Sequence, residues 1–451
     1  MEIKKNIFRA YDVRGVYPEE INDYTAYIFG KAFGTYIQNL GKNKVVVGHD
    51  NRKSSNNLTD NLIRGLLETG VDVTHLGLVT TPMYYYSWEI LNIPSGIMVT
   101  ASHNPKDDNG FKFAFDERGN AKGEMIEDFY KFLIKNEFKS GKGKLYTYDI
   151  EKDYIKLFKN TLDIKNKVKV VLDLGNGTTS IIARKIYENF NIDLDIIFEK
   201  SDSTFPNHHP DPCVEDNLRY LKQKVIQTKA DIGIGFDGDG DRLGVILENG
   251  QYIPCDKYMA IIIRDIINKV ENKTFLYDVK CSKMLEDEIK KLGGTPFCYK
   301  TGNSYTKNKT AEMDLAFGGE FSGHVYFRDK FKGFDSGLYA GLRLVEILSK
   351  TDKKASELLE GLEHYFSTDE IKIKSTDTKK YEIVKSILDY SKEKKYNYID
   401  IDGVKVIFED GFALVRVSNT GPNITARFEA KTEERLNQIK EEFMNKINTL
   451  L

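Results

Sequence analysis

The sequence has few cysteines and no long hydrophobic run, and each shortage excludes a class of protein. Its four cysteines, among 451 residues, are widely separated and form no Cys-x-x-Cys pair. This spacing argues against a zinc site and is typical of reduced thiols in the cytosol. The most apolar stretch, residues 259–263, ends at Arg264 and is too short to cross a bilayer.

The sequence also lacks a large excess of either positive or negative charge. The formal net charge is −2, and lysines and acidic residues are interspersed, so no global positive field would recruit nucleic acid. The first five residues lack the apolar core of a signal peptide. We therefore expect a cytoplasmic protein without nucleic-acid or membrane partners, in which any anion-binding site is local.

The chain is long enough for two to four domains at roughly 100–200 residues each. Three segments repeat the order apolar strand, polar loop, amphipathic helix, which is typical of α/β folds. We expect their strands at residues 44–48, 168–172 and 274–277, and their helices at residues 57–68, 180–189 and 283–291. This recurrence predicts three related α/β domains. The segment 371–451 differs and reads as mixed strands and helices, with a terminal helix over residues 432–450.

A serine follows a short apolar run in the motif Thr100-Ala-Ser-His-Asn-Pro105. Residues 96–99 suit a buried strand, so Ser102 would lie at the carboxyl end of that strand. Loops at this edge of an α/β sheet commonly form the binding site. A serine hydroxyl there could carry a phosphoryl group, although a free serine is a weak nucleophile. Taken alone, the serine could equally be a solvated turn residue.

Three aspartates stand at alternate positions in Asp237-Gly-Asp-Gly-Asp-Arg242. An extended backbone points alternate side chains the same way, so Asp237, Asp239 and Asp241 can converge on one cation. Oxygen ligands at this spacing suit Mg²⁺, which often completes its coordination shell with a phosphate oxygen. A phosphorylated Ser102 would supply that oxygen.

The same aspartate spacing also opens an EF-hand calcium loop, with Glu248 at the twelfth position. However, Arg242 stands at the sixth position, where an EF-hand needs glycine for its sharp turn. Residues 243–247 read as a strand rather than as part of a loop. The pattern therefore favours magnesium over a calcium loop.

Together these motifs resemble the α-D-phosphohexomutases, in particular the bacterial phosphomannomutase/phosphoglucomutase branch. The resemblance runs in order from Phe8-Arg-Ala-Tyr-Asp-Val-Arg-Gly15 to Arg416-Val-Ser-Asn-Thr-Gly-Pro422, and such an ordered set is more specific than any one motif. It implies an α/β fold of four domains around a central cleft, three related mixed α/β domains and a smaller C-terminal α+β domain. We place them at residues 1–147, 148–251, 252–366 and 367–451.

The resemblance also implies roles for the residues around the serine. Ser102 would be the phosphoserine, and it would share the bound Mg²⁺ with the three aspartates. Arg14 and Lys112 would flank it, where positive charge stabilises a transferring phosphoryl group. Tyr11 and Arg242 would contact the bound substrate.

Sugar recognition is implied for the loop Gly318-Gly-Glu-Phe-Ser-Gly-His324. Glu320 and Ser322 offer acceptors for vicinal hydroxyls, and the form of the loop is closest to the mannose/glucose branch. His324 is a candidate general acid or base because histidine titrates near neutrality. A purely structural histidine is the alternative for this position.

One cleft residue departs from the family pattern. Lys280 resembles a substrate-binding and catalytic lysine of the third domain, but Asn303 stands where the nearest relatives carry histidine. An amide donates and accepts hydrogen bonds but cannot shuttle a proton at neutral pH. Proton transfer would therefore depend on His324 and Lys280.

The last motif resembles the loop that holds the non-reacting phosphate of the substrate. Arg416 can bind phosphate with two parallel hydrogen bonds. Further donors would come from Ser418, Asn419 and Thr420. A simple turn between two strands is the alternative for this segment taken alone.

The resemblance implies a phosphohexomutase that interconverts hexose 1-phosphates and hexose 6-phosphates. The reaction would pass through phosphoserine and a hexose 1,6-bisphosphate, which also serves as activator. The fourth domain would close as a lid that excludes water. We expect hexose phosphates as the only partners of a monomer or weak homodimer.

Three alternatives stay open. They are a phosphoglucosamine mutase, a sugar-phosphate phosphatase that uses the same serine and metal, and a binding protein without turnover. The choice among mannose, glucose and glucosamine phosphates also stays open.

Overall fold

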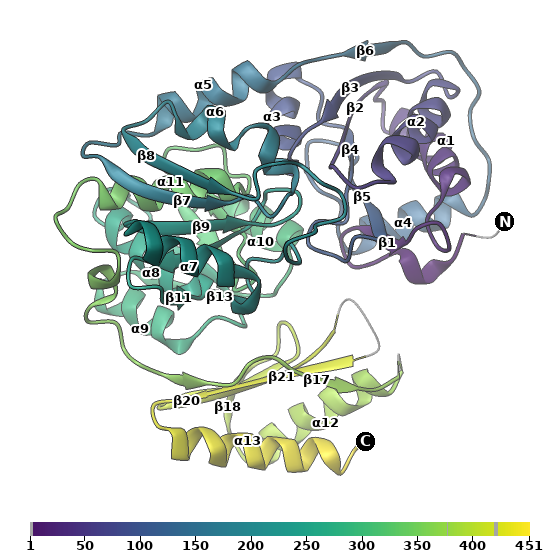
Figure 1. Ribbon diagram of the computed structural model, residues 1–451. Helices are drawn as coiled ribbons and strands as arrows, with labels where there is room; N and C mark the ends of the chain where they lie inside the picture. Colours follow the sequence, from purple (N-terminus) through teal and green to yellow (C-terminus); the bar gives the residue numbers. More distant parts are fainter. Residues whose placement is uncertain (1–2, 377, 419–422) are drawn as a thin grey trace.

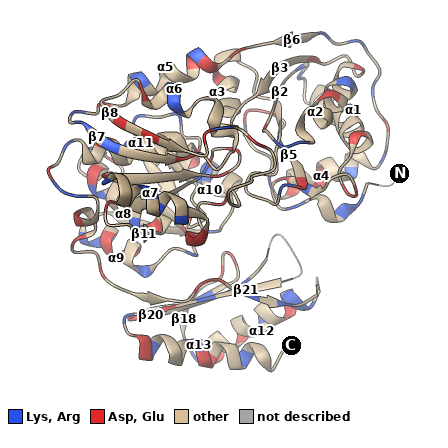
Figure 2. Cartoon of the chain, in the orientation of Figure 1, with Lys and Arg blue, Asp and Glu red and all other residues tan. Residues whose placement is uncertain are grey.

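The computed structural model describes residues 3–376, 378–418 and 423–451, which form four β-sheets with helices packed on them (Figure 1). Lys and Arg are interspersed with Asp and Glu over the molecule rather than gathered in one region (Figure 2). Across the described ranges, no helix has both the length and the apolarity needed to span a membrane.

The first three sheets repeat one arrangement of four strands. The order is β5-β4-β2-β3 in the first sheet, β10-β9-β7-β8 in the second and β15-β14-β12-β13 in the third. In each, three strands are parallel and the fourth turns back antiparallel. The three related α/β domains expected from the sequence are therefore confirmed as copies of one topology.

Among the strands of these sheets, β2, β7 and β12 confirm the segments expected at residues 44–48, 168–172 and 274–277. The strands have the following bounds. In the first sheet they are β1 (Val13–Val16), β2 (Lys44–His49), β3 (Asp72–Leu78), β4 (Gly96–Val99), β5 (Asp108–Ala114) and β6 (Leu145–Thr147). In the second sheet they are β7 (Val168–Asp173), β8 (Ile192–Ile197), β9 (Ile232–Phe236), β10 (Leu243–Leu247) and β11 (Tyr252–Ile253). In the third sheet they are β12 (Thr274–Asp278), β13 (Thr295–Tyr299), β14 (Phe317–Gly319) and β15 (Val325–Phe327). The domain boundaries near residues 148, 252 and 367 stay predictions.

The helices lie on the faces of these sheets (Figure 1). Several begin at a side chain that accepts a backbone N–H hydrogen bond, such as Asn22, Thr80 and Ser336, which is the usual way to satisfy a helix N-terminus. They are α1 (Asp23–Asn39), α2 (Ser55–Leu67), α3 (Thr81–Leu91), α4 (Glu124–Leu133), α5 (Glu151–Thr161), α6 (Ala183–Tyr187), α7 (Arg219–Thr228), α8 (Cys255–Ile266), α9 (Lys283–Lys291), α10 (Asn303–Glu312) and α11 (Gly337–Leu348). Short 3₁₀ helices occupy Lys5–Ile7, Thr178–Ile181, Glu215–Leu218 and Ser356–Leu359.

Two of the three expected helices are confirmed. The third, expected as one continuous helix over residues 180–189, is wrong. Helices α2 and α9 cover the first and last predicted segments, whereas residues 180–189 divide into a 3₁₀ turn and the short helix α6. The break falls at Ile182, whose φ of −134° is not helical. The preceding run is rich in β-branched residues, which lose rotamer freedom in a helix.

All strand pairs of the fourth sheet are antiparallel, and the sheet forms a separate layer (Figure 1). Its strands are β16 (Phe366–Ser367), β17 (Ile371–Lys374), β18 (Asn397–Ile399), β19 (Val404–Phe408), β20 (Gly411–Val417) and β21 (Asn423–Ala430). Helices α12 (Lys379–Glu393) and α13 (Glu433–Asn448) cover the face that points away from the other sheets (Figure 1). This confirms the smaller C-terminal α+β domain.

Each of the three related units carries a predicted site loop at the same position. The loop always joins the last parallel strand to its antiparallel partner: β4 to β5, β9 to β10 and β14 to β15. These turns contain Ser102, the aspartate triplet and the segment 320–324 respectively. The repeated topology therefore places three different loops in equivalent positions.

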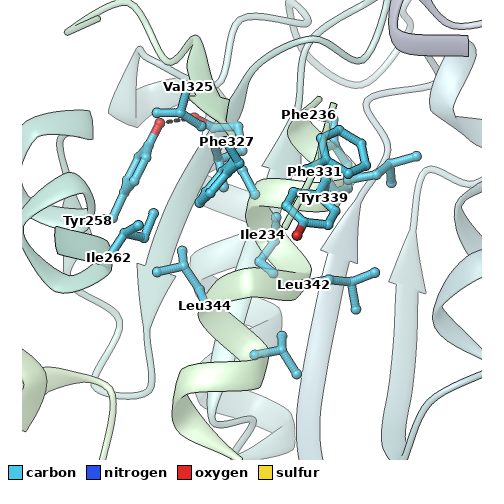
Figure 3. Close-up of a cluster of buried hydrophobic side chains, with 14 of the residues drawn as sticks. Ile234, Phe236, Tyr258, Ile262, Val325, Phe327, Phe331, Tyr339, Leu342 and Leu344 are labelled. Carbon is cyan, nitrogen blue, oxygen red and sulfur yellow. Dashed lines mark hydrogen bonds between the residues drawn. The ribbon is translucent and has the colours of Figure 1, made fainter. Parts of the chain in front are cut away.

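The second and third sheets share one hydrophobic core. Tyr339 and Leu342 of α11 belong to the same buried cluster as Ile234 and Phe236 of β9 and Phe327 of β15 (Figure 3). One face of the first sheet also joins this core, through Val46 of β2 and Met98 of β4, whereas its other face and the fourth sheet have clusters of their own. A much smaller cluster, Val279 with Phe412 and Leu414, joins the third sheet to the fourth.

The shared core predicts that the second and third sheets lose stability together. Ile234 is fully buried, so Ile234→Ala should lower the free energy of unfolding by about 2–5 kcal/mol. Hydrogen exchange should quicken in both sheets and in α11, but not in α13. As a matched control, Ile439→Ala in the core of the fourth sheet should quicken exchange only there. Faster exchange confined to the second sheet in the Ile234 variant would contradict a shared core.

Candidate active site

Ser102 lies in the turn after β4, in a strained and buried position. Its φ is +52°, an uncommon value for a residue with a side chain, and such strain gathers at functional sites. Its backbone N–H donates to Oγ1 of Thr100 at 2.9 Å, and its carbonyl accepts from Nη2 of Arg52 at 2.7 Å. The turn is therefore held from both sides, which fixes the direction of the hydroxyl.

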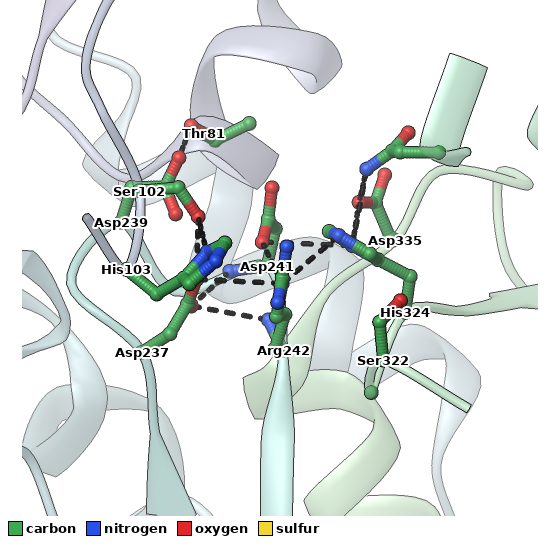
Figure 4. A network of polar contacts seen from close by, with 12 residues as sticks. Thr81, Ser102, His103, Asp237, Asp239, Asp241, Arg242, Ser322, His324 and Asp335 are labelled. Carbon is green, nitrogen blue, oxygen red and sulfur yellow. Dashed lines mark hydrogen bonds and ion pairs between the residues drawn. The ribbon is translucent and has the colours of Figure 1, made fainter. Parts of the chain in front are cut away.

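The Ser102 hydroxyl meets the aspartate loop of the second sheet. Its Oγ donates to Oδ2 of Asp237 at 2.8 Å (Figure 4). The two loops touch closely, because a methyl group added to Gly238 would lie 2.6 Å from the carbonyl oxygen of Ser102. A glycine is therefore required where the two loops cross.

The three aspartates converge as the alternating pattern predicts. The backbone N–H groups of residues 240, 241 and 242 donate to Oδ1 of Asp237 at 3.0 to 3.2 Å, which curls the loop around this carboxylate. One carboxylate oxygen from each of Asp237, Asp239 and Asp241 lies within 4.8 Å of the others. All three side chains are almost completely buried.

The loop is not a calcium-binding EF-hand. Strand β10 begins directly after Arg242. Glu248, which would be the last calcium ligand, instead accepts a hydrogen bond from the backbone N–H of Ser356 at 2.9 Å.

The electrostatics of the triplet suit a hard divalent cation. Burial, and then the charges of Asp241 and Asp239, raise the pKa of Asp237 well above its ordinary value. Oδ1 of Asp239 and Oδ1 of Asp241 are buried without a hydrogen-bond partner in the described chain. Carboxylate oxygens left in this way are the ligands that Mg²⁺ prefers, so these residues fit the expected metal.

Two cations from the first sheet hold the site together. Lys112 of β5 donates from Nζ to Oδ2 of Asp239 at 2.8 Å and to Oδ2 of Asp241 at 2.7 Å. Burial acts to lower the pKa of Lys112, but these two carboxylates outweigh it and raise the pKa well above the ordinary value. Arg14 of β1 donates from Nη1 to the carbonyl of Ala101 at 3.1 Å and to Oδ1 of Asn104 at 2.8 Å, so it braces the serine turn.

The loop between β14 and β15 presents the predicted sugar contacts. Glu320 accepts at Oε1 from the N–H of Gly302 at 2.7 Å and from the hydroxyl of Thr306 at 2.6 Å. Ser322 donates to Oε2 of the same glutamate at 2.9 Å. Burial raises the pKa of Glu320. The carboxylate is thus oriented by three donors before any ligand arrives.

His324, at the end of this loop, lies between Arg242 and a residue that sequence reasoning missed. Its Nε2 lies 3.0 Å from Nε of Arg242, and its Nδ1 lies 2.8 Å from Oδ2 of Asp335 (Figure 4). The amide of Asn303, the position that departs from the family pattern, also donates to Oδ2 of Asp335. Burial acts to raise the pKa of Asp335, but the hydrogen bond from His324 and the charge of Lys307 lower it below its ordinary value.

Asp335 had no signal in the sequence that could have identified it. It stands in Gly333-Phe-Asp-Ser-Gly337, where the glycines and serine suggest only a loop before a helix. Arg52 was missed for the same reason, since its contacts to the serine turn are made across about 50 residues of chain.

The fourth sheet contributes Arg416 from β20. Nη2 of Arg416 donates to both carboxylate oxygens of Asp402, at 3.1 and 2.9 Å, while its Nε is buried without a hydrogen-bond partner in the described residues. Asp402 also accepts the backbone N–H of Thr301 at 3.0 Å. Ser418 follows at the end of β20, whereas Asn419 and Thr420 lie outside the described residues.

A cavity of about 570 Å³ connects these groups. Its lining comes from all four sheets and includes Tyr11, Arg14, Arg242, Lys280, Glu320, Ser322, His324, Arg416 and Ser418. Lys280 lies 3.8 Å from a carboxylate oxygen of Glu370. Ser102 and Lys112 line a much smaller adjoining hollow that shares Arg14, Arg242 and His324 with the cavity. The volume suits a small polar ligand such as a sugar phosphate.

Comparisons with known proteins agree with this layout. Models for phosphoglucomutase/phosphomannomutase alpha/beta/alpha domains I, II and III match residues 5–140, 152–250 and 254–365, and the model for the C-terminal domain matches residues 370–446.

Two curated relatives match over nearly their full length. A phosphomannomutase/phosphoglucomutase of Pseudomonas aeruginosa is 38% identical, over 99% of this chain and 96% of its own. A phosphoglucomutase of Neisseria gonorrhoeae is 36% identical, over 98% of this chain and 96% of its own. The crystal structure of a phosphoglucomutase/phosphomannomutase family protein from Burkholderia thailandensis superposes with a TM-score of 0.93 at 35% identity, covering 100% of this chain and 98% of its own.

The raised pKa of Asp237 predicts a pH-dependent effect of Mg²⁺ on stability. Because the folded pKa of this carboxyl lies above its ordinary value, the metal-free protein loses stability as the pH rises through that pKa. A divalent cation offsets the repulsion, so the increase in melting temperature caused by Mg²⁺ should grow as the pH rises above the ordinary pKa of a carboxyl group. Thermal unfolding with and without Mg²⁺ measures this directly.

The matched control for that prediction is Asp237→Asn. This variant should be less sensitive to pH and should gain little from Mg²⁺, since one of the three repelling carboxylates is gone. An equal gain from Mg²⁺ in the variant and the wild type would place the metal elsewhere.

Proposed function

Because the chain belongs to the phosphoglucomutase/phosphomannomutase family, we propose that it interconverts the 1-phosphate and the 6-phosphate of a hexose. It is an enzyme of the isomerase class that moves a phosphoryl group within one sugar. The observation that carries the proposal is the 2.8 Å contact between Ser102 and Asp237 at the edge of a cleft lined by all four sheets.

Ser102 is the phosphoryl carrier in this proposal. The bond between phosphorus and Oγ of phosphorylated Ser102 breaks, and a new bond forms between phosphorus and a free hydroxyl of the bound hexose phosphate. The serine oxygen leaves and ends as a hydroxyl, and the proton that it gains balances the one that the sugar hydroxyl gives up. The sugar becomes a 1,6-bisphosphate. After the bisphosphate turns end for end, the serine takes back the other phosphoryl group, and the same bisphosphate added in trace amounts restores any serine that has lost its phosphate.

Phosphoryl transfer requires alignment and charge neutralisation more than covalent chemistry from the protein. Asp237, Asp239 and Asp241 would hold Mg²⁺, which would neutralise charge on the phosphoryl oxygens. Lys112 fixes two of these carboxylates in place. Arg14 braces the serine turn, so that Ser102 keeps its direction when the phosphoryl group leaves.

His324 serves as the proton acceptor. His324 and Arg242 both line the cleft, and Nε2 of His324 lies 3.0 Å from Nε of Arg242, where a sugar hydroxyl could replace the arginine as hydrogen-bond partner. The proton of the attacking hydroxyl passes to this nitrogen as the new bond to phosphorus forms. Asn303 cannot take this role, because an amide does not accept a proton at neutral pH.

The opposite end of the sugar is held by the third and fourth sheets. Glu320 and Ser322 accept the vicinal hydroxyls, and Lys280 adds a positive charge. Arg416, with Ser418, Asn419 and Thr420, binds the phosphate that does not react. Nε of Arg416 is buried and free of protein partners in the described chain, which suits a phosphate oxygen.

The preferred substrates in this proposal are mannose and glucose phosphates. Turnover of the 1-phosphates of mannose, glucose and glucosamine, side by side with Mg²⁺ and a trace of hexose 1,6-bisphosphate, tests it. We expect comparable rates of 6-phosphate formation from the first two and little from the third. Preference for glucosamine 1-phosphate would overturn the sugar assignment, and release of free phosphate without any 6-phosphate would instead indicate a phosphatase.

Two serine substitutions distinguish the residue that carries the phosphoryl group from a residue that contacts the sugar. Ser102→Ala should remove the covalent phosphate, seen by intact-protein mass spectrometry, and lower kcat by more than about 10³-fold. Ser322→Ala should keep the phosphate on Ser102 and act mainly on KM, because it removes only a hydroxyl beside Glu320. If the alanine variant at position 102 still carries phosphate and turns over, another residue is the carrier.

A further inference from the structure

The residue behind His324 is a buried aspartate outside the aspartate triplet. Asp335 belongs to the segment between β15 and α11 and has no solvent-exposed surface. Its backbone pairs with Tyr326 of β15 in an isolated bridge, and the next residue, Ser336, caps α11. Both ends of the residue are thus anchored, and its carboxylate points at the imidazole (Figure 4).

The polar neighbours of the imidazole determine which of its nitrogens carries the proton. Nδ2 of Asn303 lies 3.0 Å from Nδ1, but it donates to the same carboxylate oxygen of Asp335 that Nδ1 faces, so that oxygen accepts from both nitrogens. The ionised carboxylate of Asp335 only accepts hydrogen bonds, whereas the guanidinium of Arg242 only donates them. Nδ1 of His324, 2.8 Å from Oδ2 of Asp335, must therefore carry the hydrogen. Nε2, 3.0 Å from Nε of Arg242, must be the acceptor. Asp241, the other nearby carboxylate, lies farther from Nδ1, at 3.6 Å.

Two further residues hold the carboxylate of Asp335 in this orientation. Asn303 donates from Nδ2 to the same Oδ2 atom that His324 uses. The amide cannot be turned around, because its oxygen would then face a carboxylate oxygen. Lys307, on the same helix α10, lies 3.9 Å from Oδ1 and supplies the opposite charge. His324 is the only titratable partner of Oδ2 among the hydrogen bonds of the described chain.

We propose that Asp335 is a positioning residue that keeps His324 in the tautomer with a hydrogen on Nδ1 and an unprotonated Nε2, with Asn303 orienting Asp335. This inference rests on the proposed function, since it is the lone pair on Nε2 that accepts the proton of the sugar hydroxyl. Asp335 itself neither touches the substrate nor accepts the proton.

Asp335→Asn replaces a carboxylate, which only accepts hydrogen bonds, with an amide that can also donate, at almost the same side-chain volume. The new amide can donate to Nδ1, which moves the hydrogen of the imidazole to Nε2 and places it against the N–H of Arg242. In a serine protease, the corresponding exchange of an aspartate behind a catalytic histidine lowers kcat by about 10⁴-fold with the geometry intact. We expect a fall in kcat of roughly 10²–10⁴-fold here, with KM changed by less than about threefold, because no substrate contact is lost.

Asp329→Asn provides a matched control. Asp329 lies on the same segment and pairs with the buried Arg343 at 2.7 Å, but it makes no contact with His324 among the described hydrogen bonds and ion pairs. Its substitution should reduce stability and leave kcat within about threefold of wild type. Asn303→Leu, which removes one of two donors to Oδ2, should lower kcat less than Asp335→Asn does.

A spectroscopic readout separates a tautomer effect from a merely structural one. In the full-length protein labelled with ¹⁵N-histidine, the side-chain nitrogen shifts of neutral His324, assigned by their loss in His324→Gln, report which nitrogen is protonated. The wild type should show protonated Nδ1, and Asp335→Asn should show protonated Nε2. This measurement needs no substrate, so it can succeed even if the proposed reaction is wrong.

Each result decides the proposal. A loss of kcat together with a change of tautomer in Asp335→Asn supports it. It is overturned if wild-type His324 carries its hydrogen on Nε2, if Asp335→Asn loses kcat with an unchanged tautomer, or if Asp335→Asn retains wild-type kcat. Absence of mutase turnover in the wild type itself would count against the proposed function rather than against the tautomer assignment.

Discussion

The rest of the site depends on the neutralisation of several negative charges that are buried close together. Asp237, Asp239, Asp241 and Asp335 are all nearly inaccessible to solvent, and an unpaired buried charge costs several kcal/mol. Lys112 of the first sheet pairs with Asp239 and Asp241 of the second unit, whereas Asp335 and its partner Lys307 belong to the same, third unit. The charges of Asp239 and Asp241 are therefore balanced by Lys112 only when the first and second units meet at their loop edges. The electrostatics of the site and the arrangement of the sheets thus depend on each other.

Local features of this protein could be read from the sequence because their causes are local. Apolar runs bounded by polar loops predicted the strands β2, β7 and β12, and alternation along an extended chain predicted that the three aspartates converge. The helix expected at residues 180–189 was wrong, because a β-branched run favoured a 3₁₀ turn there. Assignments to Asn419 and Thr420 fall outside the described residues and stay predictions.

Pairings made across long stretches of sequence could not be read in this way. Nothing in the sequence indicates that Lys112 bridges two aspartates more than 120 residues away, or that Asp335 lies behind His324. Asn303 was recognised only as a residue that cannot transfer protons. In the structure Asn303 is a hydrogen-bond donor to Asp335. This role depends on the position of Asp335 and therefore on tertiary packing.

The equivalent position of the three site loops has a consequence for how such an enzyme could arise and diverge. If one ancestral strand-and-helix unit was duplicated twice, each copy inherited a hairpin turn whose two ends are fixed by the flanking strands. The sequence of that turn could then change without disturbing the framework. One copy could specialise in carrying the phosphoryl group, a second in holding the metal and a third in contacting the sugar. Specialisation of the three duplicated units thus requires few changes outside three short turns.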